Sequence, residues 1–226
     1  DVNTASGIVL GNDASNRTIT ATFETQTAAT TVTGGISASD TGDTVTLNFL
    51  DVTNTTAPEV VTVSGAVSGF IDAINVGSAT VAGAVKFTGD VAATMITVDG
   101  GQTDETSNIE FADMNVTGEV NLDKATADST VTYSGSSAQT QTGVVHAVDA
   151  GDGKIVISNT AGTTFTANIG TDAAVGEIEV GATGIGIFNA IVDVALVDLD
   201  GHMTIKENGN AATNFTLADG ATLVID

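Results

Sequence analysis

Residues 71–90 read IDAINVGSATVAGAVKFTGD, and this stretch decides the fold that we expect for the chain. Small and β-branched residues alternate along it, and Gly77, Gly83 and Gly89 interrupt the alternation. β-Branched residues favour strands, whereas glycines between short apolar runs mark the turns that join them. The stretch therefore indicates short strands separated by tight bends.

The same pattern continues along all 226 residues. Turn-forming pairs such as GN, GD and DG separate short runs of β-forming residues. We expect strands at 18–23, 44–49, 60–63, 80–87, 95–98, 115–122, 130–133, 154–158, 164–169, 191–200 and 221–226. Residues 58–74 are the best helix candidate, but Thr, Val, Ser and Gly form helices poorly, so a strand is favoured there as well.

Two all-β architectures fit these strands: a parallel β-solenoid, and one or two β-sandwich domains. Hydrophobic residues make up 42% of the chain, but aromatic residues only 4%. A sandwich has a thick core that favours large side chains, whereas Val, Ile, Leu, Ala and Thr fill the narrow lumen of a solenoid. We therefore predict a single irregular parallel β-solenoid (β-helix) over residues 1–226, with a potential subdivision near 100–108. At about 20 to 25 residues per coil, it would make roughly nine to eleven coils.

The charge of the chain is strongly one-sided. There are 28 acidic residues against five basic ones, which gives a formal net charge of −23. Nucleic-acid binding requires clustered Lys and Arg, but Arg17, Lys86, Lys124, Lys154 and Lys206 are scattered singly, so nucleic acid is not expected as a partner. Membrane insertion is not expected either, because no apolar run approaches the length of about 20 residues that a spanning helix needs. Cysteine is absent, which excludes disulfides and zinc–thiolate sites.

Calcium is the one cofactor that the residues support. Hard cations bind carboxylate and carbonyl oxygens, and loops rich in Asp, Asn and Gly present both. The candidate ligands are Asp40 with Asp43, Asp149 with Asp152, Asp198 with Asp200, and the loop that contains Asp99, Asp104 and Glu105. Solvated turns have the same composition, so each loop also has a purely structural interpretation.

We expect no enzyme activity. Asp198 and Asp200 could form the carboxylate pair of a glycosidase, but the chain has no Trp and one Tyr with which to stack a sugar ring. His146 lies among apolar neighbours and is interpreted as a strand residue, and His202 follows Asp200 at a turn. Neither a G-x-S-x-G motif nor a glycine-rich phosphate loop with a lysine is present.

Asn-x-Thr sequences are the acceptors of N-linked glycosylation. They occur at Asn16, Asn54, Asn115 and Asn214. In a chain rich in Asn and Thr such matches also arise by chance. They are therefore glycosylation candidates only if the source glycosylates its surface proteins.

Residues 71–101 resemble the passenger regions of bacterial autotransporters and related adhesins, in which sequences similar to VGxxTVxGxVxFxG recur. GDTVTLNF (42–49) and AGDGKIVIS (150–158) resemble degenerate versions of the calcium-binding repeats of secreted and S-layer proteins. This resemblance implies a secreted or cell-surface structural protein.

Apolar strand sequences stand near both ends of the chain. Open strand edges pair with another chain unless they are capped. We therefore expect self-association, into a homo-oligomer or polymer, through Ile8, Val9, Leu10, Leu223, Val224 and Ile225. The alternative is that the sequence is an excerpt of a longer solenoid.

Together these features predict an extracellular structural protein, a self-assembling subunit of a surface layer, filament or matrix fibre. Two alternatives stay open. The first is an adhesin or passenger segment that binds a partner, such as a surface glycan, through its side faces. The second is a carbohydrate-active enzyme built on a β-helix.

Overall fold

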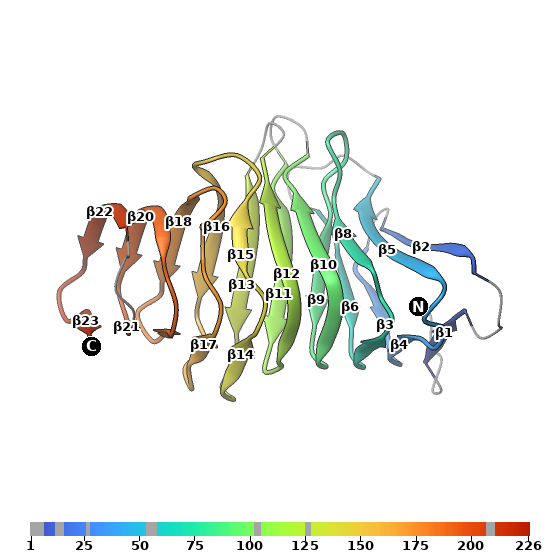
Figure 1. Cartoon of the computed structure of the whole chain (residues 1–226), viewed down its shortest axis with the longest axis horizontal. Coiled ribbons are helices and arrows are strands. Elements are labelled where there is room, and N and C mark those ends of the chain that lie inside the picture. The colour runs from blue at the N-terminus through green and yellow to red at the C-terminus, as the bar shows by residue number, and fades with distance from the viewer. Residues whose placement is uncertain are drawn as a thin grey trace.

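The computed structural model describes residues 7–11, 16–25, 28–52, 58–101, 105–124, 128–206 and 211–226. Over these residues the protein is all-β, without a helix, and winds into a parallel β-solenoid of about eight turns (Figure 1). The predicted fold class is therefore confirmed, although the turns are fewer than the roughly nine to eleven that we expected from a coil of 20 to 25 residues. The segment 58–74 contains strands, as the sequence favoured.

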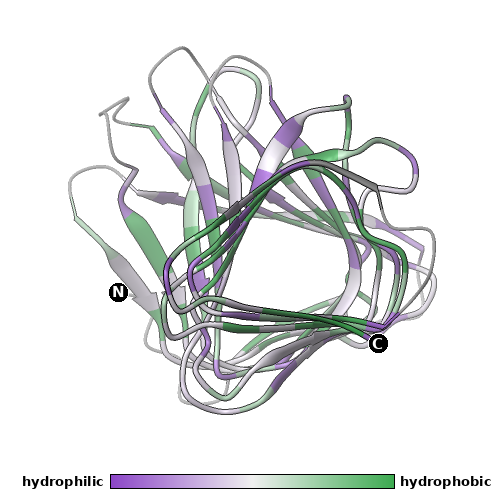
Figure 2. Ribbon diagram, turned by 90° about the vertical axis from the view of Figure 1, so that its left-hand side faces the viewer, coloured by the Kyte–Doolittle hydropathy of each residue, from purple (hydrophilic) through white to green (hydrophobic). Residues whose placement is uncertain are grey.

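The strands stack into three faces around one lumen (Figure 2). The ten-strand face consists of β1 (Ile8–Leu10), β4 (Ile36–Ala38), β7 (Val67–Gly69), β10 (Val91–Asp99), β12 (Val116–Asp123), β14 (Gln139–Gln141), β17 (Thr163–Phe165), β19 (Ile185–Phe188), β21 (His202–Ile205) and β23 (Thr222–Ile225). The nine-strand face consists of β3 (Thr30–Val32), β6 (Val60–Val63), β9 (Ala84–Phe87), β11 (Ser107–Ala112), β13 (Ser129–Ser134), β16 (Asp152–Ile157), β18 (Val175–Val180), β20 (Asp193–Leu199) and β22 (Ala211–Leu217). The short face consists of β2 (Thr18–Thr25), β5 (Thr44–Asp51), β8 (Ala73–Val76) and β15 (Val145–Ala147), with the second halves of β10 and β12.

β10 and β12 bend in the middle and so belong to two faces. The bend in β10 lies at a register shift between Ala92 and Met95. In β12 it lies at Gly118, whose φ of 140° is unfavourable for other residues. A Cβ at Gly118 would stand 2.2 Å from the carbonyl oxygen of Ala93, so the close approach of the two coils also requires glycine.

The coils shorten toward the C-terminus. Residues in register on the ten-strand face are 31 positions apart at Ile36 and Val67 but only 17 apart at Phe188 and Ile205. Beyond β15 the short face is reduced to single bridges at Ile169 and Val192. The rod is therefore narrower at its C-terminal end, as Figure 1 shows.

Val, Ile and Leu side chains fill one continuous core, as expected from the composition. The low aromatic content had suggested a lumen filled by aliphatic side chains rather than bulky rings, and that expectation was wrong. Seven of the nine aromatic residues stack in a single column, with ring centroids 4.9 to 5.9 Å apart. The column runs through Phe23, Phe49, Phe87, Phe111, Tyr133, Phe165 and Phe188. The column needs only one ring per coil, so the low aromatic content of the chain gave no sign of it.

Candidate functional sites

The rung formed by β22 and β23 leaves the lumen uncovered at one end of the rod. Phe215 and Ile225 are 43% and 75% exposed. Their register partners in the preceding rung, Val197 and Ile205, are buried. The apolar columns of the core thus reach the surface here, next to strand edges that can pair.

The six residues predicted for self-association all lie in the two terminal rungs. Val9, Val224 and Ile225 are exposed, whereas Ile8, Leu10 and Leu223 are partly buried against the core. Their positions agree with the prediction, and their association with another chain stays a prediction.

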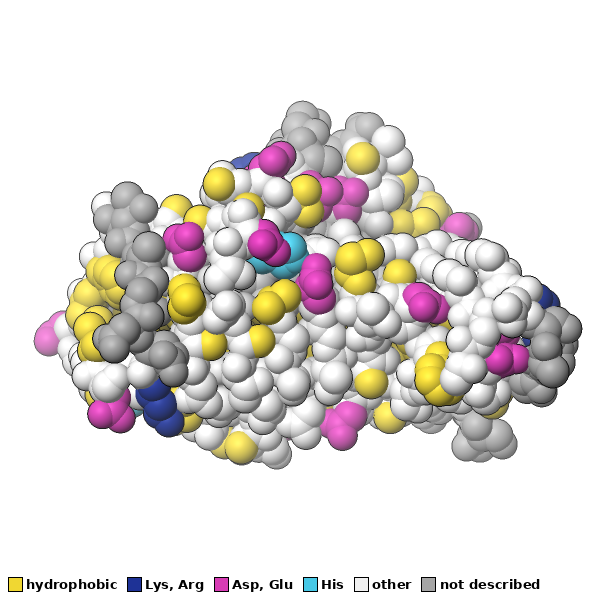
Figure 3. Space-filling model, in the orientation of Figure 1, with side chains coloured by type: hydrophobic (Ala, Val, Ile, Leu, Met, Phe, Trp, Pro, Cys, Tyr) yellow, Lys and Arg dark blue, Asp and Glu magenta, His cyan; other side chains and the backbone are white. Residues whose placement is uncertain are grey.

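Charged residues are absent from one face of the rod. The ten-strand face has no Asp, Glu, Lys or Arg in β1, β4, β7, β14, β17, β19, β21 and β23, nor in the parts of β10 and β12 that belong to it. The charged residues of β10 and β12, such as Asp99 and Glu119, lie in their second halves, on the short face. Figure 3 shows acidic side chains scattered over the visible surface of the rod.

Asp40 and Asp43, the first calcium candidates, both accept hydrogen bonds from backbone N–H groups. Asp43 Oδ1 accepts a hydrogen bond from the Arg17 backbone N–H at 2.8 Å, and Asp43 Oδ2 lies 3.9 Å from the guanidinium. Asp40 Oδ1 accepts a hydrogen bond from the Gly42 N–H at 2.9 Å. These carboxylates therefore fasten the turn that precedes β5.

Of the second calcium pair, Asp149 lies in the turn before β16 and Asp152 is the first residue of that strand. The Asp152 N–H donates a hydrogen bond to the Asp149 carbonyl at 3.1 Å. The structure brings this turn close to Asp99 and Asp123, which are in register on the preceding coils. Burial, and then the negative charges of Asp99, Asp152 and Asp149, raise the pKa of Asp123. Three coils thus contribute carboxylates to one acidic row.

Asp198 and Asp200 do not form an isolated pair. Asp198 is in register with Glu179 on the outer side of the nine-strand face, while Asp200 lies in the turn after β20. Lys154 Nζ is 3.1 Å from Glu177 Oε1 and also contacts Glu179. Burial alone lowers the pKa of Lys154, but hydrogen bonds to Glu179 and Glu177 raise it overall. This part of the surface is a cross-coil ion-pair network.

Glu105 and Asp104 are the remaining acidic candidates, and the structure describes only the first of them. Glu105 is buried in the loop before β11, whereas Asp104 lies outside the described residues. In the part of the chain that the structure describes, no three His, Cys, Asp or Glu side chains converge to hold a metal ion. No helix long and apolar enough to span a membrane occurs in that part either.

The two histidines have different surroundings. His146 lies on β15 between carboxylates from two other coils, with Nε2 2.9 Å from Glu119 Oε1. His202 lies on β21, and its Nε2 is 3.2 Å from Thr204 Oγ1. The sequence interpretation of His146 as a strand residue is confirmed, but the carboxylates beside it were not foreseen.

Three of the four glycosylation candidates are described. Asn16, Asn115 and Asn214 are exposed, and Asn54 lies outside the described residues. Asn115 Oδ1 accepts a hydrogen bond from the Thr140 N–H on the next coil at 3.0 Å. Asn115 therefore has a structural use in addition to its sequence motif.

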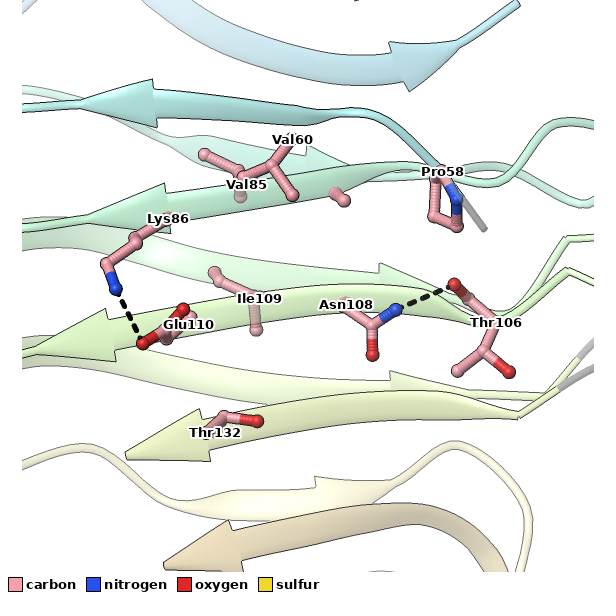
Figure 4. A pocket seen from close by; sticks show the side chains of 10 residues that line it. Pro58, Val60, Val85, Lys86, Thr106, Asn108, Ile109, Glu110 and Thr132 are labelled. Carbon is pink, nitrogen blue, oxygen red and sulfur yellow. Dashed lines mark hydrogen bonds and ion pairs between the residues drawn. The ribbon is translucent and has the colours of Figure 1, made fainter. Parts of the chain in front are cut away.

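A hollow of about 380 Å³ lies on the outer side of the nine-strand face (Figure 4). Pro58 and Val60 border it, and the small side chain of Ala84 leaves the space open. Lys86 Nζ, at its margin, is 2.9 Å from Glu110 Oε1. The walls are thus largely apolar, and these two charged groups neutralise each other.

Asp113 is a structural residue that the sequence interpretation missed. Its carboxylate accepts hydrogen bonds at 2.6 Å from the backbone N–H groups of Ser136 and Ser137, on the next coil. These bonds, first that of Ser137 and then that of Ser136, lower the pKa of Asp113. Its position directly after a strand, in ADMN (112–115), is the signal that could have indicated a turn stabilised by hydrogen bonds to an aspartate side chain.

Comparison of the chain with protein-family models, with curated protein sequences and with solved structures gave no match.

Proposed function

We propose that the protein is an extracellular structural subunit whose rods join end to end into a filament, surface layer or matrix fibre. The observation that carries this proposal is the uncovered lumen at β22 and β23. Phe215, Leu217 and Ile225 are in register with core residues, yet each is exposed. Another rung of parallel strands would bury them and would pair the free strand edges.

The composition of the terminal strands supports association at this end. β22 reads AATNFTL and β23 reads TLVI, so neither contains a charged residue. By contrast, β18 and β20 each contain two acidic residues. Charges on an edge strand protect against unwanted pairing. A rung without them is suited to receive another chain.

A second copy of this chain is a suitable partner for the uncovered rung. The strands β1 and β3 at the other end of the rod each pair on one edge only. Stacking β1 of one copy on β23 of the next would continue the parallel arrangement of the ten-strand face. Such head-to-tail contacts generate an open filament when the rotation between successive copies does not close a ring.

Phe215→Asp tests this proposal, with Phe70→Asp as its matched control. Phe70 is 49% exposed, like Phe215 lies outside the aromatic column, and occupies the corner between β7 and β8, in an internal coil. Both variants change the charge of the chain equally. We expect negative-stain electron microscopy and light scattering to show rods longer than one subunit for the parent and Phe70→Asp, and single subunits for Phe215→Asp. A parent that stays monomeric, or a Phe215→Asp variant that assembles like the parent, would contradict the proposal.

The adhesin alternative is favoured by the uncharged ten-strand face. Thr140 and Thr164 are register neighbours on this face, and Thr204 continues their row on the far side of Ile187. An uncharged, hydroxyl-rich partner such as a neutral polysaccharide can form hydrogen bonds on this face without stripping water from carboxylates. Co-sedimentation with chitin tests this alternative. We expect Thr164→Asp to reduce binding and Thr132→Asp, on the nine-strand face, to leave it unchanged. No binding by the parent would refute it for this polysaccharide.

A further inference from the structure

His146 lies between two carboxylates on the outside of the solenoid. Its Nε2 is 2.9 Å from Glu119 Oε1, and its Nδ1 is 3.6 Å from Asp172 Oδ2. The His146 side chain is only 14% exposed, whereas that of Asp172 is 80% exposed. The space between Nδ1 and Asp172 therefore borders solvent on the side of Asp172.

The two ring nitrogens are not used in the same way. A distance of 2.9 Å allows Nε2 to donate a hydrogen bond to Glu119, which leaves the lone pair of a neutral imidazole on Nδ1. Nδ1 is buried and has no hydrogen-bond partner. The 3.6 Å to Asp172 is longer than the 2.7 to about 3.2 Å of a hydrogen bond from nitrogen to oxygen. In the neutral tautomer with its proton on Nε2, two electron-pair donors therefore face one another across a gap.

Asn121 presents a further oxygen donor on the neighbouring coil. It lies on β12, in register with His146 on β15, and neighbouring strands are about 4.8 Å apart. Asn121 Oδ1 is also buried without a hydrogen-bond partner. Asn121, His146 and Asp172 come from three successive coils, and two of the three present an unpaired buried atom.

We propose that His146 Nδ1 and Asp172 Oδ2 hold a divalent transition-metal ion of the zinc class, with water or Asn121 Oδ1 completing the shell. Zinc binds imidazole nitrogen and carboxylate oxygen at about 2.0 to 2.2 Å, so two such ligands on a tetrahedral ion lie about 3.3 to 3.6 Å apart. The observed separation of 3.6 Å between Nδ1 and Oδ2 agrees with that geometry.

Glu119 completes the arrangement without touching the ion. In metal sites the second ring nitrogen of a histidine ligand commonly donates to a carboxylate, which fixes the tautomer and orients the ring. Glu119 is placed to do this. The imidazole also sets this site apart from the calcium candidates, because calcium prefers oxygen ligands alone.

A metal ion here would tie coils together where the sheet is weakest. The short face has no strand beyond β15 among the described residues, and only single bridges continue it. An ion bound by the folded chain alone raises its stability by linkage. We therefore expect zinc to raise the melting temperature, and to do so through this site.

Zinc titration followed by calorimetry, in the presence of excess calcium, tests the site. Calcium occupies carboxylates that bind cations without selectivity. We expect His146→Gln to weaken zinc binding by at least about tenfold and Asp172→Asn to weaken it in the same direction. His202→Gln is the matched control and is expected to bind zinc like the parent. Unchanged zinc affinity in His146→Gln, or displacement of zinc by calcium, would overturn the proposal.

Nuclear magnetic resonance of the His202→Gln chain detects zinc at His146 directly, and it leaves the proposed ligands unchanged. This chain has one histidine, so its ring nitrogens are assigned without ambiguity. We expect zinc to shift the Nδ1 resonance while Nε2 keeps its proton. A shift of Nε2 instead, or no shift of either nitrogen, would show that the ion does not bind as proposed.

Discussion

Phe111→Leu is the substitution that measures what the aromatic column contributes to stability. Phe111 is fully buried, and its ring centroid lies 5.9 Å from that of Phe87 and 5.5 Å from that of Tyr133. Leucine keeps the position apolar and removes both ring pairs. Each aromatic pair contributes about 0.5 to 1.5 kcal/mol beyond burial, and an apolar swap of similar volume costs up to about 1.5 kcal/mol. We therefore expect Phe111→Leu to lower the free energy of unfolding by about 2 to 4 kcal/mol.

Phe188→Leu is the internal control for this number. Phe188 is equally buried but ends the column, with one ring neighbour, Phe165, at 4.9 Å. Its register neighbour on the next coil is Ile205. Because only one ring pair is lost, we expect the destabilisation to be about 1 kcal/mol smaller than for Phe111→Leu.

Urea unfolding followed by circular dichroism and by tyrosine fluorescence measures both free energies. The chain has a single tyrosine, Tyr133, so the fluorescence reports on the column itself. The two probes must give one transition with an unchanged m value for the comparison to hold. Equal losses in Phe111→Leu and Phe188→Leu would refute the reasoning that ring pairs, rather than burial alone, stabilise the column.

Three further outcomes are expected. Asp113→Asn keeps a residue that tolerates the positive φ of 59° but removes the charge. Because the folded chain lowers the pKa of Asp113, the carboxylate stabilises the fold fully above the unfolded pKa of about 3.9, and this stabilisation disappears as the pH falls through the folded pKa. Thermal melts should therefore show a lower melting temperature for Asp113→Asn at neutral pH, and the difference from the parent should fade in acid. Asp123→Asn should raise the melting temperature at neutral pH, because the raised pKa of Asp123 means that its charge destabilises the fold there. Below a pH of about 4 this increase in melting temperature should vanish. Tyr133→Phe deprives Gln141 Oε1 of the hydroxyl that donates to it at 3.0 Å, and should cost about 1 to 3 kcal/mol in urea unfolding; no loss would show that Gln141 finds another donor.

The fold could be predicted from the sequence because the signals that specify it are local. Alternating Val, Ile and Thr residues marked most strands, and glycine, asparagine and aspartate marked the bends between them. In 80–87 the apolar run suggested one long strand, but only Ala84–Phe87 is strand, because residues 78–83 are taken up by a bend. The six residues predicted for self-association lie in the two terminal rungs, and their association stays a prediction.

The surroundings of the candidate sites could not be predicted, because they depend on the register between coils. Partners on adjacent coils are separated by 31 residues in one place and 17 in another, so no fixed spacing reveals them. Glu119 meets His146 across 27 positions, and Asp113 meets Ser137 across 24. The column of rings escaped prediction for the same reason, since a single phenylalanine in a coil carries no sign that others lie above and below it.

The stacking of coils of unequal length has a mechanical consequence. Each coil is held by its immediate neighbours, so a pull on the C-terminal tip loads one rung at a time instead of the whole rod. The shortest coils, which offer the fewest backbone bonds, lie nearest to that tip. Under tension the chain should therefore unwind in successive steps, first of 20 residues from Ile225 back to Ile205, then of 17 back to Phe188, and later of 31 between Val67 and Ile36. A rod built in this way yields progressively at one end, with increasing resistance, before the other end gives way.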